Sequence, residues 1–379
     1  MKYISYYDTP ANKAERRGYV LAATNKMDYI CSALNQIGYA VEIISASVTA
    51  NRKGCKGKTV QLSEKTSLKL FPCLGTGALP KRLLRRLLVR SKLFCELVFK
   101  TKKGEDVLVY HSLGYVGTIA LAKKIRKFRL ILEVEEIYAD VNGKKKDRQR
   151  EFRTFKMADA YLFPTELLNE AINQENKPYA IIHGTYQVEA DRQCDVFGAD
   201  AKNKIHCVYA GTFDPRKGGA IAAASAASFL PEGYHIHILG GGSKKSVDAM
   251  QSLVKELSAK CACSISYDGF LSGEEYIRFI QSCDIGLSTQ NPNAAFNATS
   301  FPSKILSYMA NGLRVVSVRI PAVEGAAIGS YMYYYDEQTP EAIAKAILSV
   351  DMNSSEEPRK IIADLDEKFQ KQLERMLEE

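Results

Sequence analysis

Short apolar segments recur along the whole chain with helical patterns between them, and this alternation constrains the fold more than any other feature. Residues 25–37, for example, carry apolar side chains at helical spacing and end before Gly38, a helix stop signal. Apolar segments this short are typical of parallel strands that helices cover on both faces. The alternation therefore predicts an α/β protein. We predict strands at residues 2–7, 39–44, 107–110, 130–134, 160–163, 206–210, 235–239, 264–267, 285–288 and 315–318.

The 379 residues are enough for two domains that each bury a core. Residues 188–204 are polar, and a new strand pattern begins at His206. We predict an N-terminal Rossmann-like domain at residues 1–187, a C-terminal one at residues 188–360, and a helix at residues 361–379 that packs back toward the N-terminal domain. That helix would bury the stripe Ile361, Leu365, Phe369, Leu373 and Met376.

The charge is divided unevenly: residues 1–185 hold 33 basic against 18 acidic side chains, and the remainder holds 19 against 25. An acidic partner would therefore meet the first half. We expect no membrane-spanning helix and no secretory signal, and so a cytoplasmic protein. Of the nine cysteines only Cys261 and Cys263 are closely paired, which predicts reduced thiols and neither a zinc site nor a disulfide framework.

Four segments in the C-terminal half carry a family resemblance, in the order HCVYAGTFDPRKGG, HIHILGGGS, SISYDGFLSGEEYIRFIQSCDIGLS and FNATSFPSKILSYMANGLRVVS. Together they resemble the C-terminal domain of retaining group 1 glycosyltransferases, also called family 4. The resemblance implies the GT-B fold, in which two Rossmann-like parallel-sheet domains face each other across a cleft. The N-terminal half is similar to the family mainly in its rhythm of strands and helices.

Each of these segments places a loop beyond the carboxyl end of a strand, where ligands bind in open α/β sheets. Gly211 and Thr212 are small, so backbone amides there can approach a phosphate. Arg216 and Lys217 follow and could neutralise a diphosphate leaving group. The family resemblance gives that role to Lys217 in particular. The alternative for both cations is a solvated turn before a helix.

Two further loops are candidates for binding the donor. Gly240 and Gly241 belong to a glycine run that forms either a phosphate cradle or a plain turn. The resemblance implies that the loop with Phe270 and Leu271 holds the nucleotide base. The alternative for Phe270 is a place in the core.

The fourth segment departs from the family pattern, which has two glutamates eight positions apart. Thr299 and Ser307 stand there instead, and a serine cannot make the bidentate contact of a carboxylate with a diol. Ser303 and Lys304 look like a known variant of this loop, with Lys304 near the phosphates, and residues 297–300 would offer backbone amides. The donor-binding candidates are Gly211, Thr212, Arg216, Lys217, Gly240, Gly241, Phe270, Leu271, Asn297, Thr299, Ser300, Ser303, Lys304 and Ser307.

In the N-terminal half, His111 follows a predicted strand, and Glu136 ends another that also carries Glu133 and Glu135. Strand alternation places Glu133 and Glu135 on one face and Glu136 on the other. Similar enzymes use a histidine or acid here for the acceptor or for proton transfer. The alternatives are a structural histidine and pairing of Glu136 with the lysines at 144–146. The catalytic candidates are His111, Glu136 and Lys217.

Residues 80–103 hold nine basic side chains, one acidic side chain and several leucines. Such a segment can bind an anionic membrane surface. The alternative is a core-packed helix with a basic outer face. We expect no nucleic-acid partner, because aromatic residues do not interleave the cations.

The resemblance implies transfer of a hexose from a nucleotide-diphosphate sugar to a glycan or lipid-linked acceptor, with retention of configuration, in bacterial surface polysaccharide synthesis. It implies no cofactor and no metal, and the sequence shows no metal ligand set. The alternatives are a non-catalytic nucleotide-sugar-binding or partner subunit and a nucleotide-sugar epimerase of the same fold.

Overall fold

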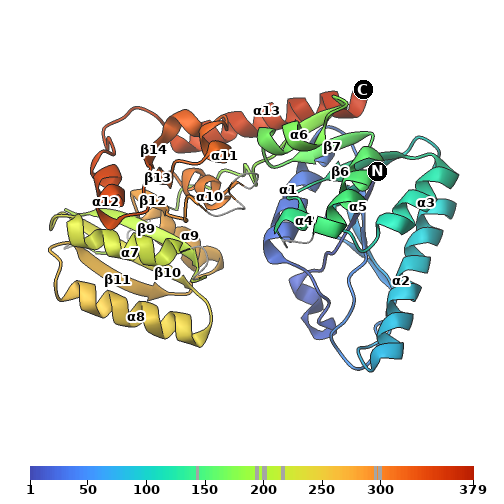
Figure 1. Cartoon of the computed structure of the whole chain (residues 1–379), viewed down its shortest axis with the longest axis horizontal. Coiled ribbons are helices and arrows are strands. Elements are labelled where there is room, and N and C mark those ends of the chain that lie inside the picture. The colour runs from blue at the N-terminus through green and yellow to red at the C-terminus, as the bar shows by residue number, and fades with distance from the viewer. Residues whose placement is uncertain (142–144, 193–195, 199–202, 215–217, 294–296, 298–300) are drawn as a thin grey trace. The chain divides into compact units, whose positions relative to one another are not determined.

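The computed structural model describes residues 1–141, 145–192, 196–198, 203–214, 218–293, 297 and 301–379 (Figure 1). The chain forms two compact units, one of Met1–Ile182 with Lys368–Glu379 and the other of His183–Glu367. The last helix, α13 (Pro358–Glu378), contributes residues to both.

In the described part of the first unit, eight strands form one sheet in the order β3-β4-β2-β1-β5-β6-β7-β8. All neighbouring strands are parallel except β3, which is antiparallel to β4. The strands are β1 (Lys2–Ser5), β2 (Val41–Ser45), β3 (Lys58–Gln61), β4 (Thr66–Leu70), β5 (Asp106–Tyr110), β6 (Arg129–Glu133), β7 (Ala160–Phe163) and β8 (Tyr179–Ile181).

Helices cover both faces of this sheet. On one face, α2 and α3 pack side by side and bury Val89, Leu93 and Ile119 against the strands. On the other face, Tyr29 of α1 stacks on Phe369 of α13. The helical segments are η1 (Pro10–Glu15), α1 (Leu21–Gln36), α2 (Leu79–Phe99), α3 (Val116–Arg126), α4 (Tyr138–Val141), α5 (Lys145–Lys156) and α6 (Glu166–Ile172).

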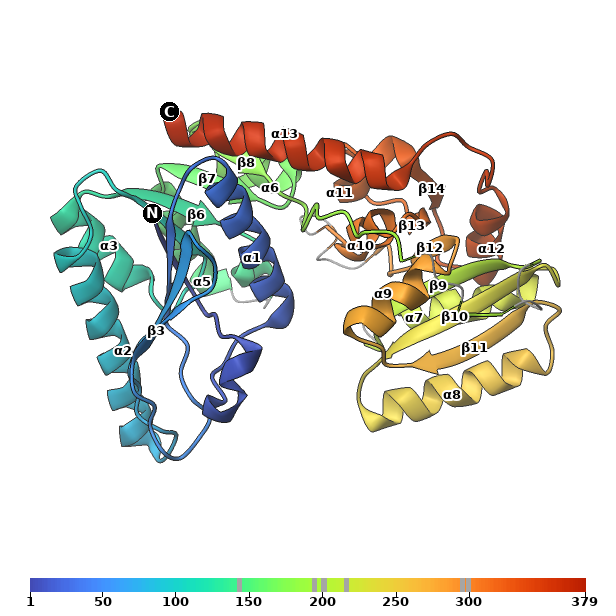
Figure 2. The same ribbon diagram turned by 180° about the vertical axis from the view of Figure 1, so that it is seen from behind.

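The sheet of the second unit is parallel throughout its described strands, in the order β11-β10-β9-β12-β13-β14 (Figure 2). Their carboxyl ends therefore meet at one edge. The strands are β9 (Ile205–Thr212), β10 (Tyr234–Gly241), β11 (Ser264–Gly269), β12 (Ile285–Ser288), β13 (Arg314–Val318) and β14 (Met332–Tyr335).

Helices α7, α8 and α12 lie on one face of this second sheet, where α7 contacts both of the others. Side chains of α9 and α10 meet one another elsewhere in the unit, at Tyr276 and Ser307. The helical segments are α7 (Gly219–Ser225), η3 (Ala226–Phe229), α8 (Lys244–Ser258), α9 (Gly273–Gln281), α10 (Lys304–Ala310), α11 (Pro321–Glu324), η5 (Gly329–Tyr331) and α12 (Pro340–Leu348).

The predicted α/β class is confirmed, and each predicted strand is present within a few residues of its predicted bounds. Four strands, β3, β4, β8 and β14, have no counterpart in the prediction. The apolar stripe of the last helix is buried at Leu365, Phe369, Leu373 and Met376, and Ile362 takes the place predicted for Ile361. Within the described residues, no helix is both long enough and apolar enough to cross a membrane.

Gly286 of β12 lets α10 pack directly on the second sheet. A Cβ atom at Gly286 would lie 2.3 Å from ring atoms of Tyr308, which is fully buried. The hydroxyl of Tyr308 accepts a hydrogen bond of 2.8 Å from the backbone N–H of Ala210. This contact therefore fixes α10 against the carboxyl end of β9.

We predict that Gly286→Ala destabilises the protein by about 1–3 kcal/mol, because the added methyl group overpacks a buried ring. Urea unfolding of the full chain measures this change. Gly233→Ala is the matched control, since a Cβ atom there meets nothing within 4 Å. Equal unfolding midpoints for the two variants would show that Tyr308 does not constrain this position.

Candidate active site

An open pocket of about 700 Å³ lies at the carboxyl ends of β9, β10 and β11 in the second unit. The ends of β9 and β10 form its floor, and α8, α9 and the loop after β11 form its walls. Its lining residues are Ala210, Gly211, Thr212, Leu239, Gly240, Gly241, Gly242, Val247, Tyr267, Phe270, Leu271 and Tyr276. Six of the predicted donor-binding residues are among them.

The floor of the pocket is bare backbone because two strands approach closely there. Gly240 has φ +129°, and a Cβ atom on it would lie 1.8 Å from the carbonyl oxygen of Gly211. Only glycine fits at Gly240, both for its φ angle and for this approach. The pocket wall continues into the start of α8, whose N-cap Ser243 accepts a hydrogen bond from the N–H of Ser246. Helix N-termini and exposed backbone amides favour phosphate groups.

Lys304 brings a positive charge to the same edge of the sheet. Its Nζ lies 4.0 Å from the ring centre of Tyr209 and 3.2 Å from where a Cβ atom of Gly211 would stand. Burial, and to a lesser degree the charge of Asp214, raises the pKa of Tyr209 to about 12. The tyrosine is therefore neutral, and its ring face holds the ammonium group. A cation beside a glycine floor can stabilise a diphosphate group.

Two aromatic side chains border the pocket in different ways. Phe270 is 75% exposed, so the alternative that it belongs to the core is wrong. An exposed ring on a pocket rim is suited to stacking on a planar base. Tyr276 of α9 has its hydroxyl 3.5 Å from Oγ of Ser307, and burial raises its pKa. Ser307 thus contacts a pocket residue but is not among the residues that line the pocket.

Of the remaining donor-binding candidates, Asn297 and Ser303 are described by the structure and the others are not. Asn297 is buried, and its amide group bonds Gln290 and the carbonyl oxygens of Asn291 and Pro292, so its side chain ties a loop together. Ser303 is exposed at the N-cap of α10. Four candidates lie outside the described residues: Arg216, Lys217, Thr299 and Ser300.

In the first unit, His111 follows β5 and is buried, with its ring between those of Tyr138 and Phe155. Its Nε2 lies 2.9 Å from Oε1 of Glu151, a residue of α5. Burial raises the pKa of Glu151, but hydrogen bonds from His111 and from the N–H groups of Ala139 and Tyr138 outweigh it and lower the pKa. The ionised carboxylate only accepts, so Nε2 of His111 carries the proton.

Nδ1 of His111 is buried and has no hydrogen-bond partner among the described groups. The residue therefore ties β5 to α5 through Nε2 and keeps one acceptor atom unused. A catalytic role for His111 stays a prediction.

The three carboxylates near the end of β6 differ in their surroundings. Tyr3 donates a hydrogen bond to the fully buried Glu133, and Lys26 of α1 lies 2.5 Å from Glu135. Both therefore lie toward the α1 side, as strand alternation predicts, although β6 ends at Glu133. Glu136 is half-buried beyond the strand, and the lysine at 144 of its predicted partner group lies outside the described residues.

Comparison with known proteins supplies the class of the second unit. Residues 204–352 match the family model described as glycosyl transferases group 1. Among curated protein sequences, none matches this chain.

Solved structures match both units together at low identity. An α,α-trehalose-phosphate synthase (UDP-forming) from Burkholderia xenovorans, in complex with glucose-6-phosphate, aligns with a TM-score of 0.70 and 11% identity, over 100% of this chain and 99% of that chain. The structure described as trehalose-6-phosphate from E. coli bound with UDP-2-fluoro glucose gives 0.67 and 11%, over 99% and 98%. Anabaena HepE in complex with UDP and glucose gives 0.64 and 11%, over 100% and 98%.

These matches establish a GT-B fold, and the family model relates the residues that hold the pocket to group 1 glycosyltransferases. The chain has the GT-B fold with two Rossmann-like parallel-sheet domains, and residues 204–352 match the group 1 glycosyltransferase family model. The predicted GT-B fold is confirmed, and the family model matches the part of the chain that carries the four sequence segments.

Sequence reasoning missed several residues of these sites. Tyr276 and Tyr267 line the pocket, and Glu151 binds His111 from a distant helix. Tyr276 follows the loop at Gly269 at helical spacing, and this pattern could have predicted that Tyr276 borders the pocket. No sequence pattern predicts the role of Glu151, because only the packing of α5 on β5 brings it to His111.

Glu133 provides a test of the first unit. Burial, and then the charge of Glu135, raises the pKa of Glu133 from its ordinary 4.5 to about 8. The folded protein therefore keeps a proton that the unfolded chain has lost, and stability falls as pH rises from about 4.5 to about 8. Glu133→Gln, which is always neutral, should lose less stability over this range.

Urea unfolding midpoints at pH 5 and pH 8 measure the effect. Glu170→Gln, at an exposed position of α6, is the control and should keep the wild-type pH dependence. If Glu133→Gln also keeps it, Glu133 is ionised in the folded protein and the argument fails.

Proposed function

We propose that the protein transfers a hexose from a nucleotide-diphosphate sugar to a glycan or lipid-linked acceptor, with retention of configuration, in bacterial surface polysaccharide synthesis. The observation that carries the proposal is the pocket, in which a glycine floor, a nearby lysine and an exposed aromatic rim occur together. Two similar structures contain UDP-2-fluoro glucose or UDP with glucose, which favours UDP-glucose as the first donor to test.

In this proposal each part of the donor meets one part of the pocket. The diphosphate lies over Gly211 and Gly240 with Lys304 beside it, and the base lies against Phe270 and Leu271. Thr212, Gly241, Asn297, Ser303 and Ser307 contribute from the surrounding loops. Lys217 is assigned to the leaving group from the family resemblance, and Arg216 is its neighbour in sequence. Thr299 and Ser300 would contribute backbone amides. The positive charges of Lys217 and Arg216 take the place of a divalent metal in the transfer step.

His111 and Glu136 are the proposed acceptor-side residues of the first unit. Nδ1 of His111 is the ring atom left to accept from a sugar hydroxyl, since Nε2 is held by Glu151, and this atom is buried and must become exposed to do so. The acceptor class is open to a direct test, because a similar synthase holds glucose-6-phosphate. Sugar phosphates therefore belong in the acceptor panel beside glycans and lipid-linked sugars.

We predict that Phe270→Ala weakens UDP binding by about tenfold, in line with about 1–3 kcal/mol for an aromatic ring stacked on a base. Calorimetric titration of the full chain with UDP measures the affinity. Phe229→Ala is the matched control, because Phe229 is also exposed but does not line the pocket. An unchanged affinity of Phe270→Ala for UDP would show that the base does not stack on Phe270.

Turnover is tested separately, by release of the nucleoside diphosphate from UDP-glucose and from other nucleotide sugars with each acceptor class. Lys304→Met should lower turnover by about two orders of magnitude, as loss of a charge-stabilising group commonly does. A wild-type protein that binds nucleotide sugars but neither hydrolyses nor transfers them would favour the non-catalytic subunit, and interconversion of sugars would favour the epimerase.

Helix α2 supports a membrane-bound site of action for the proposed enzyme. Its second half packs in the core through Val89, Leu93 and Leu97, as the core-packed alternative requires. Its first half does not: the exposed side chains there are Leu79, Lys81, Arg82, Leu83, Leu84, Arg86, Leu87 and Leu88. Leucines beside arginines fit an anionic lipid surface on the cytoplasmic side, where a lipid-linked acceptor would lie.

We predict that the protein co-sediments with anionic liposomes and less with neutral ones, and that salt weakens this binding. Changing Arg82, Leu83, Arg86 and Leu87 to Ser should abolish binding. Arg85 is left in place because it donates a hydrogen bond of 2.8 Å to the carbonyl oxygen of Thr49. Lys244→Ser with Lys245→Ser, on the exposed start of α8, is the control. If the wild type and the variant with all four changes partition equally onto anionic liposomes, a water-soluble acceptor becomes the better choice.

A further inference from the structure

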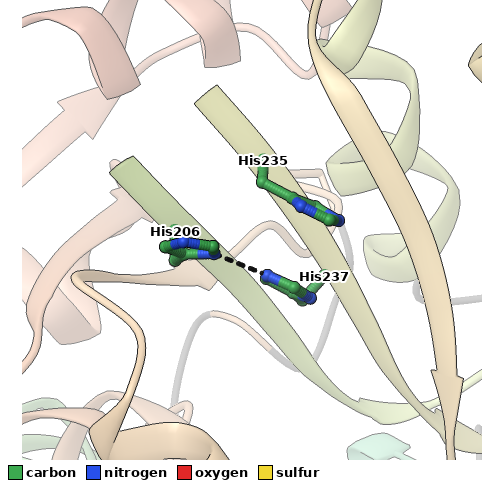
Figure 3. A group of neighbouring side chains, drawn as sticks. All are labelled: His206, His235 and His237. Atoms are coloured by element: carbon green, nitrogen blue, oxygen red, sulfur yellow. Dashed lines mark hydrogen bonds between the residues drawn. The ribbon is translucent and has the colours of Figure 1, made fainter. Parts of the chain in front are cut away.

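Three of the five histidines of the chain gather on one face of the second sheet (Figure 3). His206 of β9 pairs in register with His235 of β10, and His237 follows two residues later on the same face. One ring nitrogen from each lies within 4.8 Å of the other two. The cluster sits at the starts of these strands, whereas the donor pocket begins at Ala210 and Leu239 near their ends.

Hydrogen bonds fix the proton positions on two of the rings. Nδ1 of His237 lies 3.2 Å from Oδ2 of Asp268, so it carries a proton and its Nε2 has a lone pair. Ser266 donates to Asp268 at 2.9 Å and therefore accepts from Nε2 of His235, also at 2.9 Å. Nδ1 of His235 then has a lone pair as well.

His206 completes the set through its Nδ1, which lies 2.9 Å from Nε2 of His237 (Figure 3). In the present arrangement Nδ1 of His206 donates to that lone pair. Transfer of this proton to its own Nε2 turns Nδ1 of His206 into a third ligand without changing the charge.

Carboxylates around the cluster favour a cation. The bond from His237 to Asp268 is the contact by which proteins orient metal-binding histidines. Asp284 accepts a hydrogen bond of 2.7 Å from the backbone N–H of His206.

Aromatic rings enclose the cluster on one side. Phe197 stacks on His206 and His237 at 4.2 and 4.5 Å, and Phe279 of α9 meets His237 edge-on at 5.2 Å. His235 is only partly buried and stacks on His237 at 4.0 Å and 13°. Parallel rings direct their lone pairs side by side, so an ion requires His235 to tilt. Its partial exposure gives it the room to do so.

We propose that His206, His235 and His237 bind one divalent first-row transition-metal ion, zinc in the first place. Imidazole ligands select zinc and its neighbours over magnesium and calcium, and three histidines with a water molecule form a familiar zinc environment. The ion links β9 to β10 and stabilises the second unit. It lies outside the proposed transfer step, so this inference does not rest on the proposed function.

The test uses the full chain after treatment with a chelator. Calorimetric titration with Zn²⁺ should give one site per chain, and Zn²⁺ at 100 times Kd should raise Tm by about 5 °C or more. Co²⁺ should produce the visible absorption of a four-coordinate site, and X-ray absorption of the zinc form should show three imidazole rings. These last two measurements need no variant.

His235→Gln should abolish stoichiometric binding, and Asp268→Asn should weaken it by about 10–100-fold because it removes only the orienting contact. His183→Gln, at a histidine of the same unit outside the cluster, should bind as the wild type does. A chelator-treated wild-type chain that binds no zinc, or a His235→Gln chain that binds it unchanged, overturns the proposal and leaves the cluster as stacked rings that only pack.

Discussion

The close approach of β9 and β10 at Gly211 and Gly240 is the constraint on which the donor pocket depends. A side chain on Gly240 would collide with the carbonyl oxygen of Gly211 at 1.8 Å, so the two strands can meet this closely only through glycine. The backbone amides of the floor lie at that contact, and α8 begins shortly after β10 ends, whereas Lys304 belongs to α10, which is held by a separate contact. Tyr308 holds α10 in place, because its ring packs on Gly286 and its hydroxyl accepts a hydrogen bond from the backbone N–H of Ala210.

The parallel sheets could be predicted because buried parallel strands read as short apolar runs. The missed strands lack that pattern: β3, with sequence KTVQ, alternates partly exposed and exposed side chains at an edge of its sheet, and β8 has only three residues. The floor and rim of the pocket could also be predicted, since strand ends in an open sheet converge. The neighbours of His111 could not, because Glu151 comes from a helix whose packing no local pattern encodes.

The histidine cluster shows a second limit of sequence reasoning. The spacing of His235 and His237 places both on one face of a strand, and this could be predicted from the sequence. The register that sets His206 opposite His235 is a property of the sheet. The expectation that the chain has no metal ligand set rests on ligands close in sequence and on cysteines, whereas strand pairing joins residues far apart in the chain.

Strands β9 and β10 thus carry two kinds of chemistry at their two ends. At the carboxyl ends, glycines expose amides and a lysine supplies positive charge, which suits an anion. At the amino ends, three imidazole rings and two flanking carboxylates suit a cation. The same pair of strands connects these ends through the buried side chains of Ile236, Ile238 and Val208. A link between β9 and β10 at their starts would therefore restrain the relative position of the same two strands where Gly211 and Gly240 form the floor of the pocket.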